Sequence, residues 1–190
     1  MQDDEESDDV LIARAGRGDR LAASVLITRH SPRVLSLCLH LLKNRAAAED
    51  AAQETFLKLW EGSARWRPNG ASLSTWLYRV ATNACRDRHR ASRREAPEEA
   101  AGDRIDDAPS AEGRLSGDDR ARLVESALSR LPDNQRIAMT LRHYQELTNI
   151  EIAETMSMSV DAVESLLARA RRSLKDALAD LRDELLESVE

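Results

Sequence analysis

The sequence predicts an all-α protein made of two small helical domains that are joined by an acidic flexible linker. Its 190 residues include only seven glycines and five prolines, and strong helix formers such as Ala, Leu, Arg and Glu far outnumber β-branched residues. Apolar residues make up 42% of the chain and recur at the three- and four-residue spacing of amphipathic helices. That share of apolar residues is enough to fill the cores of two small domains.

Charge separates the two predicted domains. Over residues 62–95, eight arginines stand against two acidic residues, and the local net charge of +6 suits a polyanionic partner. Over residues 96–119, eight acidic residues stand against two arginines, a local net charge of −6, in a stretch rich in Pro and Gly. Such a stretch has too little apolar surface to offset the entropy of ordering it. We therefore expect domains at residues 1–95 and 120–190, with the linker between them.

The sequence argues against a membrane protein and against an enzyme. No apolar run approaches the roughly 18 residues that a membrane span needs, and the first ten residues are acidic where a signal peptide would be basic. We therefore expect a cytoplasmic protein without membrane insertion. Its four histidines form no zinc-protease motif, Cys38 and Cys85 lack CxxC spacing, and the sequence contains no Gly-rich phosphate loop. No catalytic residue, metal site, disulfide or cofactor is expected.

The N-terminal half begins with helices that should form a core. Ser7 or Asp8 can cap a first helix, and apolar residues continue at helical spacing over residues 22–42. The next helix is expected over residues 46–60 and carries two stripes. Its apolar stripe consists of Ala52, Phe56 and either Leu59 or Trp60. Its polar stripe consists of Asp50, Gln53 and Glu54, which from the residues alone is a solvated face.

A basic helix is expected after a loop that is marked by Pro68, Asn69 and Gly70. From Leu73 onward the sequence again has two faces at helical spacing. The apolar face consists of Leu73, Trp76, Leu77, Val80, Ala81, Ala84 and Cys85. The polar face consists of Arg79, Asn83, Arg86 and Arg90. This polar row is a candidate binding surface.

Aromatic residues concentrate in the same region. Five of the six lie between positions 56 and 78, namely Phe56, Trp60, Trp66, Trp76 and Tyr78. Unpaired bases stack on such rings for about 1–3 kcal/mol each, and arginines bind phosphates, so the region suits single-stranded or opened DNA. Phe56, Trp60 and Trp76 fit the cores of their helices equally well. Trp66 lies between two arginines in the loop and is expected at the surface.

The C-terminal half has the pattern of a helix-turn-helix. Thr148 and Glu151 have the spacing of a capping box, so a helix is expected to begin near Asn149. Ser159 can cap a second helix after a short break. The inward positions of that helix are expected to be Val160, Val163, Leu167, Ala170, Leu174, Ala177 and Leu181. In a helix-turn-helix the second helix enters the major groove of DNA N-terminus first, although a plain αα-hairpin shares the pattern.

Four segments, in this order, resemble the matching segments of extracytoplasmic-function (ECF) sigma factors, the small two-domain initiation factors of bacterial RNA polymerase. They are AAAEDAAQETFLKLW, STWLYRVATNACRDRHR, LPDNQRIAMTLRHYQELTNIEIAETM and VDAVESLLARARRSL. The resemblance runs from about Asp8 to Leu181, and the order of the four motifs on both sides of an acidic segment makes it specific. It implies a stress-response transcription factor that binds core polymerase, directs it to promoters and assists strand opening.

The resemblance also implies partners and roles for individual residues. The implied partners are core RNA polymerase (its β′ clamp and β flap), promoter DNA and an anti-sigma factor. The residues implied in polymerase binding are Asp50, Gln53 and Glu54. Those implied in binding the minus-ten element are Trp66, Arg67, Asn69, Arg79, Asn83 and Arg86. Those implied at the minus-thirty-five element are Ser165, Arg169 and Arg172, to which we add Glu164 as a candidate reader of cytosine.

The sequence departs from the family pattern in the C-terminal half. Ser157 stands where the turn commonly has Gly, and Glu164 and Leu166 stand where the second helix commonly has a basic residue. Residues 120–190 carry ten basic and thirteen acidic residues, so the net charge of −3 predicts weak intrinsic attraction to DNA. Two other classes share parts of the pattern. One is a stand-alone helix-turn-helix regulator, which would carry a strand-rich receiver domain, and the other is a helical adaptor with a dimer seam over residues 174–185.

Overall fold

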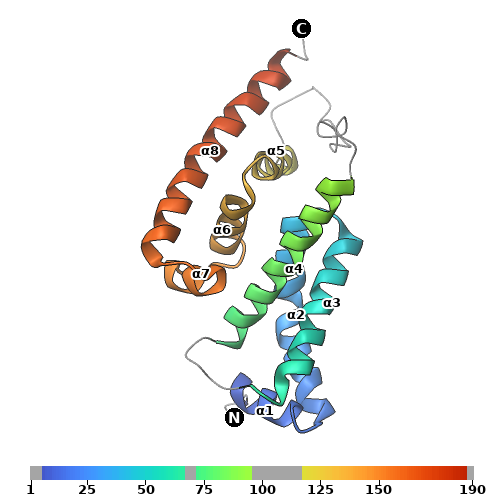
Figure 1. The fold of residues 1–190 in the computed structure, drawn as a ribbon. Coiled ribbons are helices and arrows are strands. Elements are labelled where there is room, and N and C mark those ends of the chain that lie inside the picture. The colour runs from blue at the N-terminus through green and yellow to red at the C-terminus, as the bar shows by residue number, and fades with distance from the viewer. Residues whose placement is uncertain (1–5, 67–71, 96–116, 188–190) are drawn as a thin grey trace.

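The computed structural model describes residues 6–66, 72–95 and 117–187, with the backbone alone at residues 93–95, 117–122 and 182–187. Every regular element in these ranges is a helix, so the all-α prediction is confirmed (Figure 1). The helices are α1 (Asp8–Ala15), α2 (Arg20–Leu42), α3 (Arg45–Ser63), α4 (Leu73–Glu95), α5 (Gly117–Ser129), α6 (Asp133–His143), α7 (Asn149–Met156) and α8 (Val160–Glu187). None of the described helices is both long and apolar enough to cross a membrane.

Helices α1 to α4 form an N-terminal bundle, in which α2 packs against each of the other three (Figure 1). The side chains of Ser7, Asp19 and Asn44 accept hydrogen bonds from backbone amides in the first turns of α1, α2 and α3. A Cβ atom at Gly16, in the turn after α1, would lie 2.7 Å from the carbonyl oxygen of Ser63. The absence of a side chain at that position therefore lets the end of α1 pack closely against the end of α3.

Helices α5 to α8 form a C-terminal bundle, in which the long α8 packs against each of the other three. The buried positions of α8 include Val163, Leu166, Leu167, Ala170, Ala177 and Leu181, which agrees with most of the predicted inward stripe. Val160 differs from the prediction, because it is the first helical residue and is 37% exposed. Helix α5 begins at Gly117, so the last three residues of the expected linker are helical, and residues 96–116 lie outside the described ranges.

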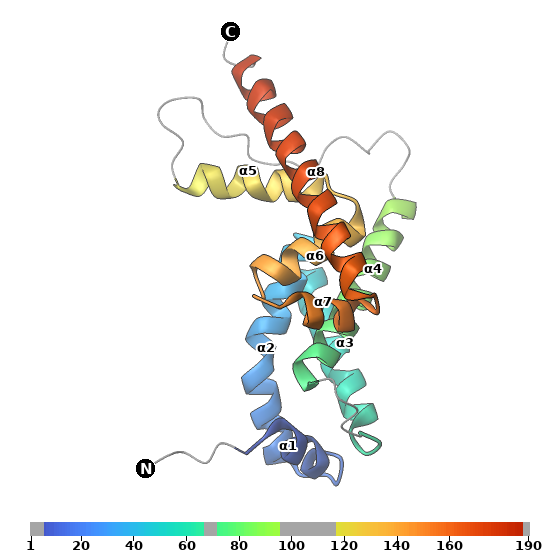
Figure 2. The ribbon, with the colours of Figure 1, turned by 90° about the vertical axis from the view of Figure 1, so that its left-hand side faces the viewer.

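The two bundles contact each other. Helix α4 packs against α7, and α2 packs against α6, so buried residues of both bundles belong to one continuous apolar core (Figures 1 and 2). At the edge of this interface, Lys43 forms an ion pair of 2.8 Å with Glu125, and the ring of His40 stacks on Tyr144 with 3.6 Å between ring centres. Burial lowers the pKa of His40, which favours the neutral ring. The structure thus has two helical bundles that pack together.

Candidate nucleic-acid interface

Helix α4 carries the basic candidate surface on the side opposite its buried stripe. Its first turn is fixed by Ser72, whose Oγ accepts a hydrogen bond of 3.1 Å from the amide of Thr75. The residues that it buries include Leu73, Leu77, Ala81, Ala84 and Cys85, whereas Trp76 and Val80 are half-buried. On the predicted polar row, Asn83 and Arg90 are exposed, and Arg79 and Arg86 are half-buried. The helical spacing therefore predicted five of the seven residues of the apolar face as buried, but it missed Tyr78, which is also buried.

The two half-buried arginines of the row are held by the C-terminal bundle. Arg79 donates a hydrogen bond of 2.8 Å from Nη2 to the carbonyl oxygen of Glu154, at the end of α7. Arg86 donates from Nη1 to Asn83 at 3.1 Å and from Nη2 to the side chain of Asn134, on α6, at 3.4 Å. The groups that could bind DNA on α4 are thus partly engaged by the protein itself.

Tyr78 and Trp66 are more buried than a base-stacking surface requires. Tyr78 is only 2% exposed, and its buried position raises the pKa of its hydroxyl. Trp66 is half-buried, contrary to the expectation of an exposed ring, because it packs edge-to-face on Trp76 with 5.9 Å between ring centres. Its indole nitrogen also donates to Asp9 at 3.4 Å. Trp60, which fitted the core by its spacing, is 45% exposed, and Leu59 fills the buried position instead.

Two residues of the implied minus-ten surface, Arg67 and Asn69, lie outside the described ranges. Their roles remain predictions from the sequence.

The acidic stripe of α3 combines two exposed side chains with one that is anchored. Asp50 and Gln53 are exposed. Glu54 accepts hydrogen bonds from Lys58 at 2.6 Å and from Arg88, on α4, at 2.8 Å. These two bonds, first that of Lys58, hold the pKa of Glu54 below its usual value, so its carboxylate is ionised at neutral pH. The stripe therefore presents two exposed polar side chains, and one carboxylate that is held by two cations, beside the basic helix.

The two cysteines lie together in the core of the N-terminal bundle. Cys38 on α2 and Cys85 on α4 are both buried, and both are free thiols. A hydrogen bond to Cys38, together with burial, raises the pKa of the Cys85 thiol. Among the described residues, no group of three or more His, Cys, Asp and Glu side chains could hold a metal ion.

The helix-turn-helix has the local structure that its sequence predicts. The capping box is formed, because Thr148 and Glu151 exchange hydrogen bonds between side chain and backbone. Ser157 ends α7 in the left-handed region at φ 55°, the conformation for which Gly is the usual residue. Ser159 then caps α8 by accepting a bond of 3.2 Å from the amide of Ala162.

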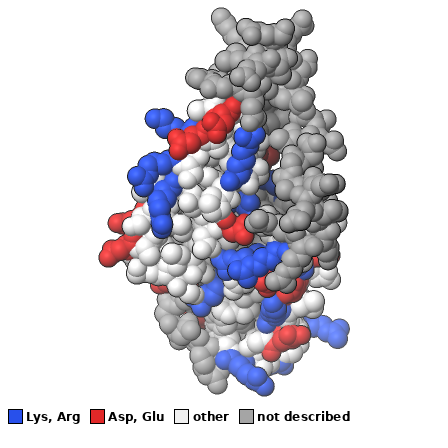
Figure 3. All heavy atoms as spheres, turned by 45° about the horizontal axis from the view of Figure 1, so that its top comes forward, with Lys and Arg blue, Asp and Glu red and all other residues white. Residues whose placement is uncertain are grey.

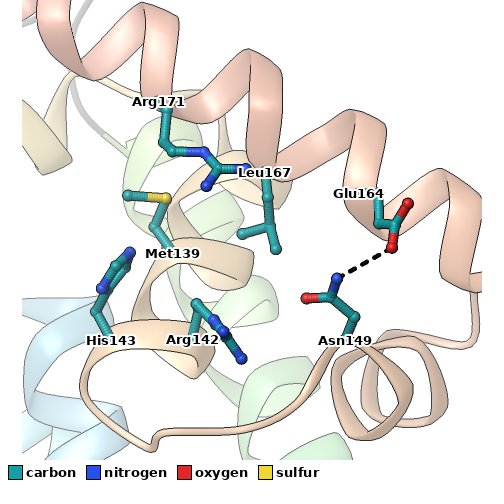
Figure 4. Close-up of a pocket in the computed structure, with 7 residues that line it drawn as sticks. All are labelled: Met139, Arg142, His143, Asn149, Glu164, Leu167 and Arg171. Atoms are coloured by element: carbon teal, nitrogen blue, oxygen red, sulfur yellow. Dashed lines mark hydrogen bonds between the residues drawn. The ribbon is translucent and has the colours of Figure 1, made fainter.

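The predicted reading residues of α8 are all at the surface. Glu164, Ser165, Arg169 and Arg172 are exposed, on the side of the helix that the core leaves open. A cavity of about 450 Å³ adjoins Glu164, between α6, α7 and α8 (Figure 4). It is lined by Met139, Arg142, His143, Asn149, Glu164, Leu167 and Arg171. No sequence pattern indicated a role for Asn149 or Arg142, although the capping box already placed Asn149 at the start of α7.

Sequence comparison identifies both bundles. The model of the family "Sigma-70 region 2" matches residues 26–95, and that of "Sigma-70, region 4" matches residues 121–174. The RNA polymerase sigma-H factor of Pseudomonas aeruginosa is 30% identical over 187 residues, which cover 93% of this chain and 96% of that protein. The ECF RNA polymerase sigma factor SigW of Bacillus subtilis is 29% identical over 180 residues, covering 90% of this chain and 96% of that protein.

Solved structures agree with this assignment. The structure of CnrH in complex with the cytosolic domain of CnrY matches with a TM-score of 0.69 at 25% identity, over 92% of this chain and 99% of that chain. The sigma factor RpoE of Bartonella quintana, in complex with the anti-sigma factor NepR, shares the fold with a TM-score of 0.62 at 23% identity, over 82% of this chain and 96% of that chain. The chain therefore belongs to the extracytoplasmic-function sigma factors, which direct bacterial RNA polymerase to specific promoters.

Proposed function

We propose that this chain reads promoters with two surfaces, the minus-ten element with α4 and the loop before it, and the minus-thirty-five element with α8. The observation that supports this division is that each bundle presents polar residues on one helix, opposite the stripe that the same helix buries. On α4 the row is basic and suits a strand whose bases are unpaired. On α8 the exposed residues begin in the first turns, where a reading helix reaches base edges.

Docking on polymerase is assigned to the acidic stripe of α3. Asp50 and Gln53 are exposed, and Glu54 is fixed in place by Lys58 and Arg88. Because Glu54 is already held in place, it loses little side-chain entropy when it binds a partner, which favours its use in an interface. The proposed partner surface is the β′ clamp, and the C-terminal bundle is assigned to the β flap.

The minus-ten surface is assigned to Trp66, Arg67, Asn69, Arg79, Asn83 and Arg86. An unpaired base can be stacked on a ring and hydrogen-bonded by guanidinium and amide groups in the same place. Nη2 of Arg79 donates to the carbonyl oxygen of Glu154, so this group must leave α7 before it binds DNA. Promoter binding that uses Nη2 of Arg79 therefore requires the two bundles to separate.

The segment between the two proposed domains is long enough for them to separate in this way. They are residues 1–95 for the minus-ten domain, 96–119 for the linker and 120–190 for the minus-thirty-five domain. Residues 117–119 belong to α5, so the remaining part of the linker, at about 3.3 Å per residue, can span roughly 70 Å. Two turns of duplex, at about 35 Å each, would separate the two bound surfaces by a similar distance.

We also propose that the chain acts in the cytoplasm, catalyses no reaction and is inhibited by a protein partner. CnrH and RpoE are both seen with a bound partner, and RpoE's partner is named an anti-sigma factor. A protein that held the two bundles together, or covered α4, would keep this chain from promoters. We therefore expect an anti-sigma factor for this chain as well.

Run-off transcription tests the proposal. Core RNA polymerase with the purified chain should start at specific members of a promoter library, and core polymerase alone should not. The isolated chain should bind duplex DNA only weakly at physiological salt, given its net charge of −6. Tight, sequence-specific duplex binding by the chain alone, without start-site selection, would instead identify a stand-alone helix-turn-helix regulator.

A further inference from the structure

Asn149, to which no role has been assigned so far, contacts Glu164, the candidate base-reading glutamate. Glu164 is exposed in the first turns of α8, and its Oε1 accepts a hydrogen bond of 3.3 Å from Nδ2 of Asn149 (Figure 4). Asn149 is the first residue of α7. In a helix-turn-helix the first helix crosses the DNA backbone, so Asn149 stands between that backbone and the reading helix. One carboxylate oxygen of Glu164 is therefore engaged within the motif.

The backbone on both sides of this hydrogen bond is well fixed. The amide of Thr148 donates to Glu151 at 2.8 Å, which lowers the pKa of that carboxylate and closes the first turn of α7 around Asn149. On the other side Ser159 caps α8, and Val163, next to Glu164, is completely buried. The bond thus joins two helix starts whose positions the fold determines.

The charges of the adjoining cavity give the hydrogen bond a specific role. Arg142 and Arg171 line the cavity toward its other end, and among the described residues that line it Glu164 is the one acidic side chain (Figure 4). Arg142 is itself held, because its Nη1 donates to the carbonyl oxygen of Leu147 at 2.8 Å. Without Asn149, the Glu164 carboxylate would be drawn toward these guanidinium groups. The amide of Asn149 keeps it at the end of the cavity where the two helices begin.

We propose that Asn149 is a positioning residue for recognition of the minus-thirty-five element. By engaging Oε1 of Glu164, it leaves Oε2 to accept a hydrogen bond from an exocyclic amine, such as N4 of cytosine, in the major groove. It also restricts the glutamate side chain before DNA binds, so that less rotamer entropy is lost on binding. The inference rests on the proposed function, in which α8 reads the duplex.

The test uses Asn149→Asp, which keeps the shape of the side chain but replaces the amide donor with a carboxylate that repels Glu164. Transcription from a library of minus-thirty-five sequences should show a loss of preference for cytosine at one position. The expected loss is roughly three- to tenfold, the size of one ordinary hydrogen bond. In a chain that already carries Glu164→Gln, the same change at Asn149 should have little further effect on base preference.

A matched control adds the same charge elsewhere on the bundle. Ala179→Glu places one extra negative charge on α8, at an exposed position 15 residues beyond Glu164. It should lower transcription from all upstream sequences equally, without changing their ranking. Thermal unfolding of each variant shows whether the helix-turn-helix remains folded, and Asn149→Ala provides a second variant that adds no charge.

The possible outcomes separate the inference from the function on which it rests. If Glu164→Gln leaves the ranking of upstream sequences unchanged, Glu164 is not a reader and the assignment of α8 residues fails. If Glu164→Gln shifts the ranking while both Asn149 variants preserve it, the positioning role alone is overturned. A uniform loss of activity in the Asn149 variants, equal for every sequence, would place Asn149 at a phosphate and would also overturn the inference.

Discussion

The two proposed DNA-reading surfaces differ in how far the rest of the chain covers them. On α4, Arg79 and Arg86 donate hydrogen bonds to the C-terminal bundle. On α8, Ser165, Arg169 and Arg172 are exposed. The more basic surface is thus partly covered by its own chain, and the open surface belongs to the more acidic half. Neither surface alone is suited to tight DNA binding, which is consistent with a subunit that binds promoters as part of polymerase.

The distribution of charge over the molecule supports the same conclusion. On the face shown in Figure 3, Lys and Arg side chains are interspersed with Asp and Glu side chains. A surface of mixed sign produces a weak long-range field for a polyanion. We therefore expect promoter binding by both surfaces to depend on polymerase docking. Binding by α4 alone should also depend on separation of the bundles, and binding by α8 alone should depend on the local structure of the turn.

The largest effect is expected from the acidic stripe, because both reading surfaces depend on docking. The double change Asp50→Lys and Glu54→Lys should weaken binding to core polymerase by roughly 100-fold, since each reversal replaces an interfacial attraction with repulsion worth about 1.5 kcal/mol or more. Fluorescence anisotropy with labelled chain measures the affinity, and circular dichroism checks the helix content. Asp176→Lys with Asp180→Lys is the control, because it makes the same change of charge at two exposed positions of α8, away from the stripe. Equal affinities for all three chains would make the stripe a solvated face.

The next effect concerns α4 alone. Arg79→Ala with Arg86→Ala should reduce transcription by roughly 30-fold or more, because each arginine is expected to contribute about 1–3 kcal/mol at a base or phosphate. Permanganate reactivity of unpaired thymines near the start site should fall in parallel, whereas the preference among minus-thirty-five sequences should not change. The control, Arg17→Ala with Arg20→Ala, removes the same charge from exposed positions at the far end of the N-terminal bundle. A comparable fall in the control would mean that net charge, rather than α4, is responsible.

A smaller effect is expected from weakening the contact between the bundles. Glu125→Lys replaces the ion pair with Lys43 by a repulsion and also adds charge near His40. Binding of a single-stranded minus-ten oligonucleotide to the isolated chain should increase a few-fold, since half-exposed pairs contribute about 1 kcal/mol or less. Asp176→Lys changes the charge by the same amount at an exposed site on α8. An equal increase with this control would indicate simple electrostatic attraction.

The smallest effect concerns the turn before α8. Ser157 holds a left-handed conformation at φ 55°, so Ser157→Gly should raise the free energy of unfolding by about 1 kcal/mol. Ser159→Gly should lower the free energy of unfolding by a few tenths of a kcal/mol, because it removes the hydroxyl that accepts a hydrogen bond from the amide of Ala162. Urea denaturation measures both. A Ser157→Gly chain of lower stability would show that the serine side chain makes a stabilising contact in the turn.

The periodicity of the sequence predicted most of the buried stripes of α4 and α8. Periodicity indicates which side of a helix is buried, but it does not indicate which other parts of the protein contact the remaining sides of that helix. Trp66 and Trp60 illustrate this limit, since the first is covered by contacts with Trp76 and Asp9, and the second lies at the edge of its stripe. The contact between Arg79 and Glu154 joins residues 75 positions apart. No local pattern can predict such a contact, because it arises only when the two bundles pack.

The same distinction applies to the helix-turn-helix. Its caps at Thr148 and Ser159 are local and were predicted from spacing alone. The hydrogen bond from Asn149 to Glu164 depends on how α7 and α8 pack, although both residues were within the predicted motif. Local signals therefore defined the elements, and tertiary packing defined which side chains meet.

Residue-by-residue modification of arginines by phenylglyoxal, measured by mass spectrometry, tests the central comparison most directly. In the isolated chain, Arg79 should react several times more slowly than Arg169 and Arg172, because its guanidinium donates to Glu154 across the contact between the bundles. When core polymerase is added without DNA, the rate at Arg79 should rise toward that of Arg169. If Arg79 reacts as fast as Arg169 in the isolated chain, the bundles do not cover the α4 surface, and the account of two differently limited reading surfaces is wrong.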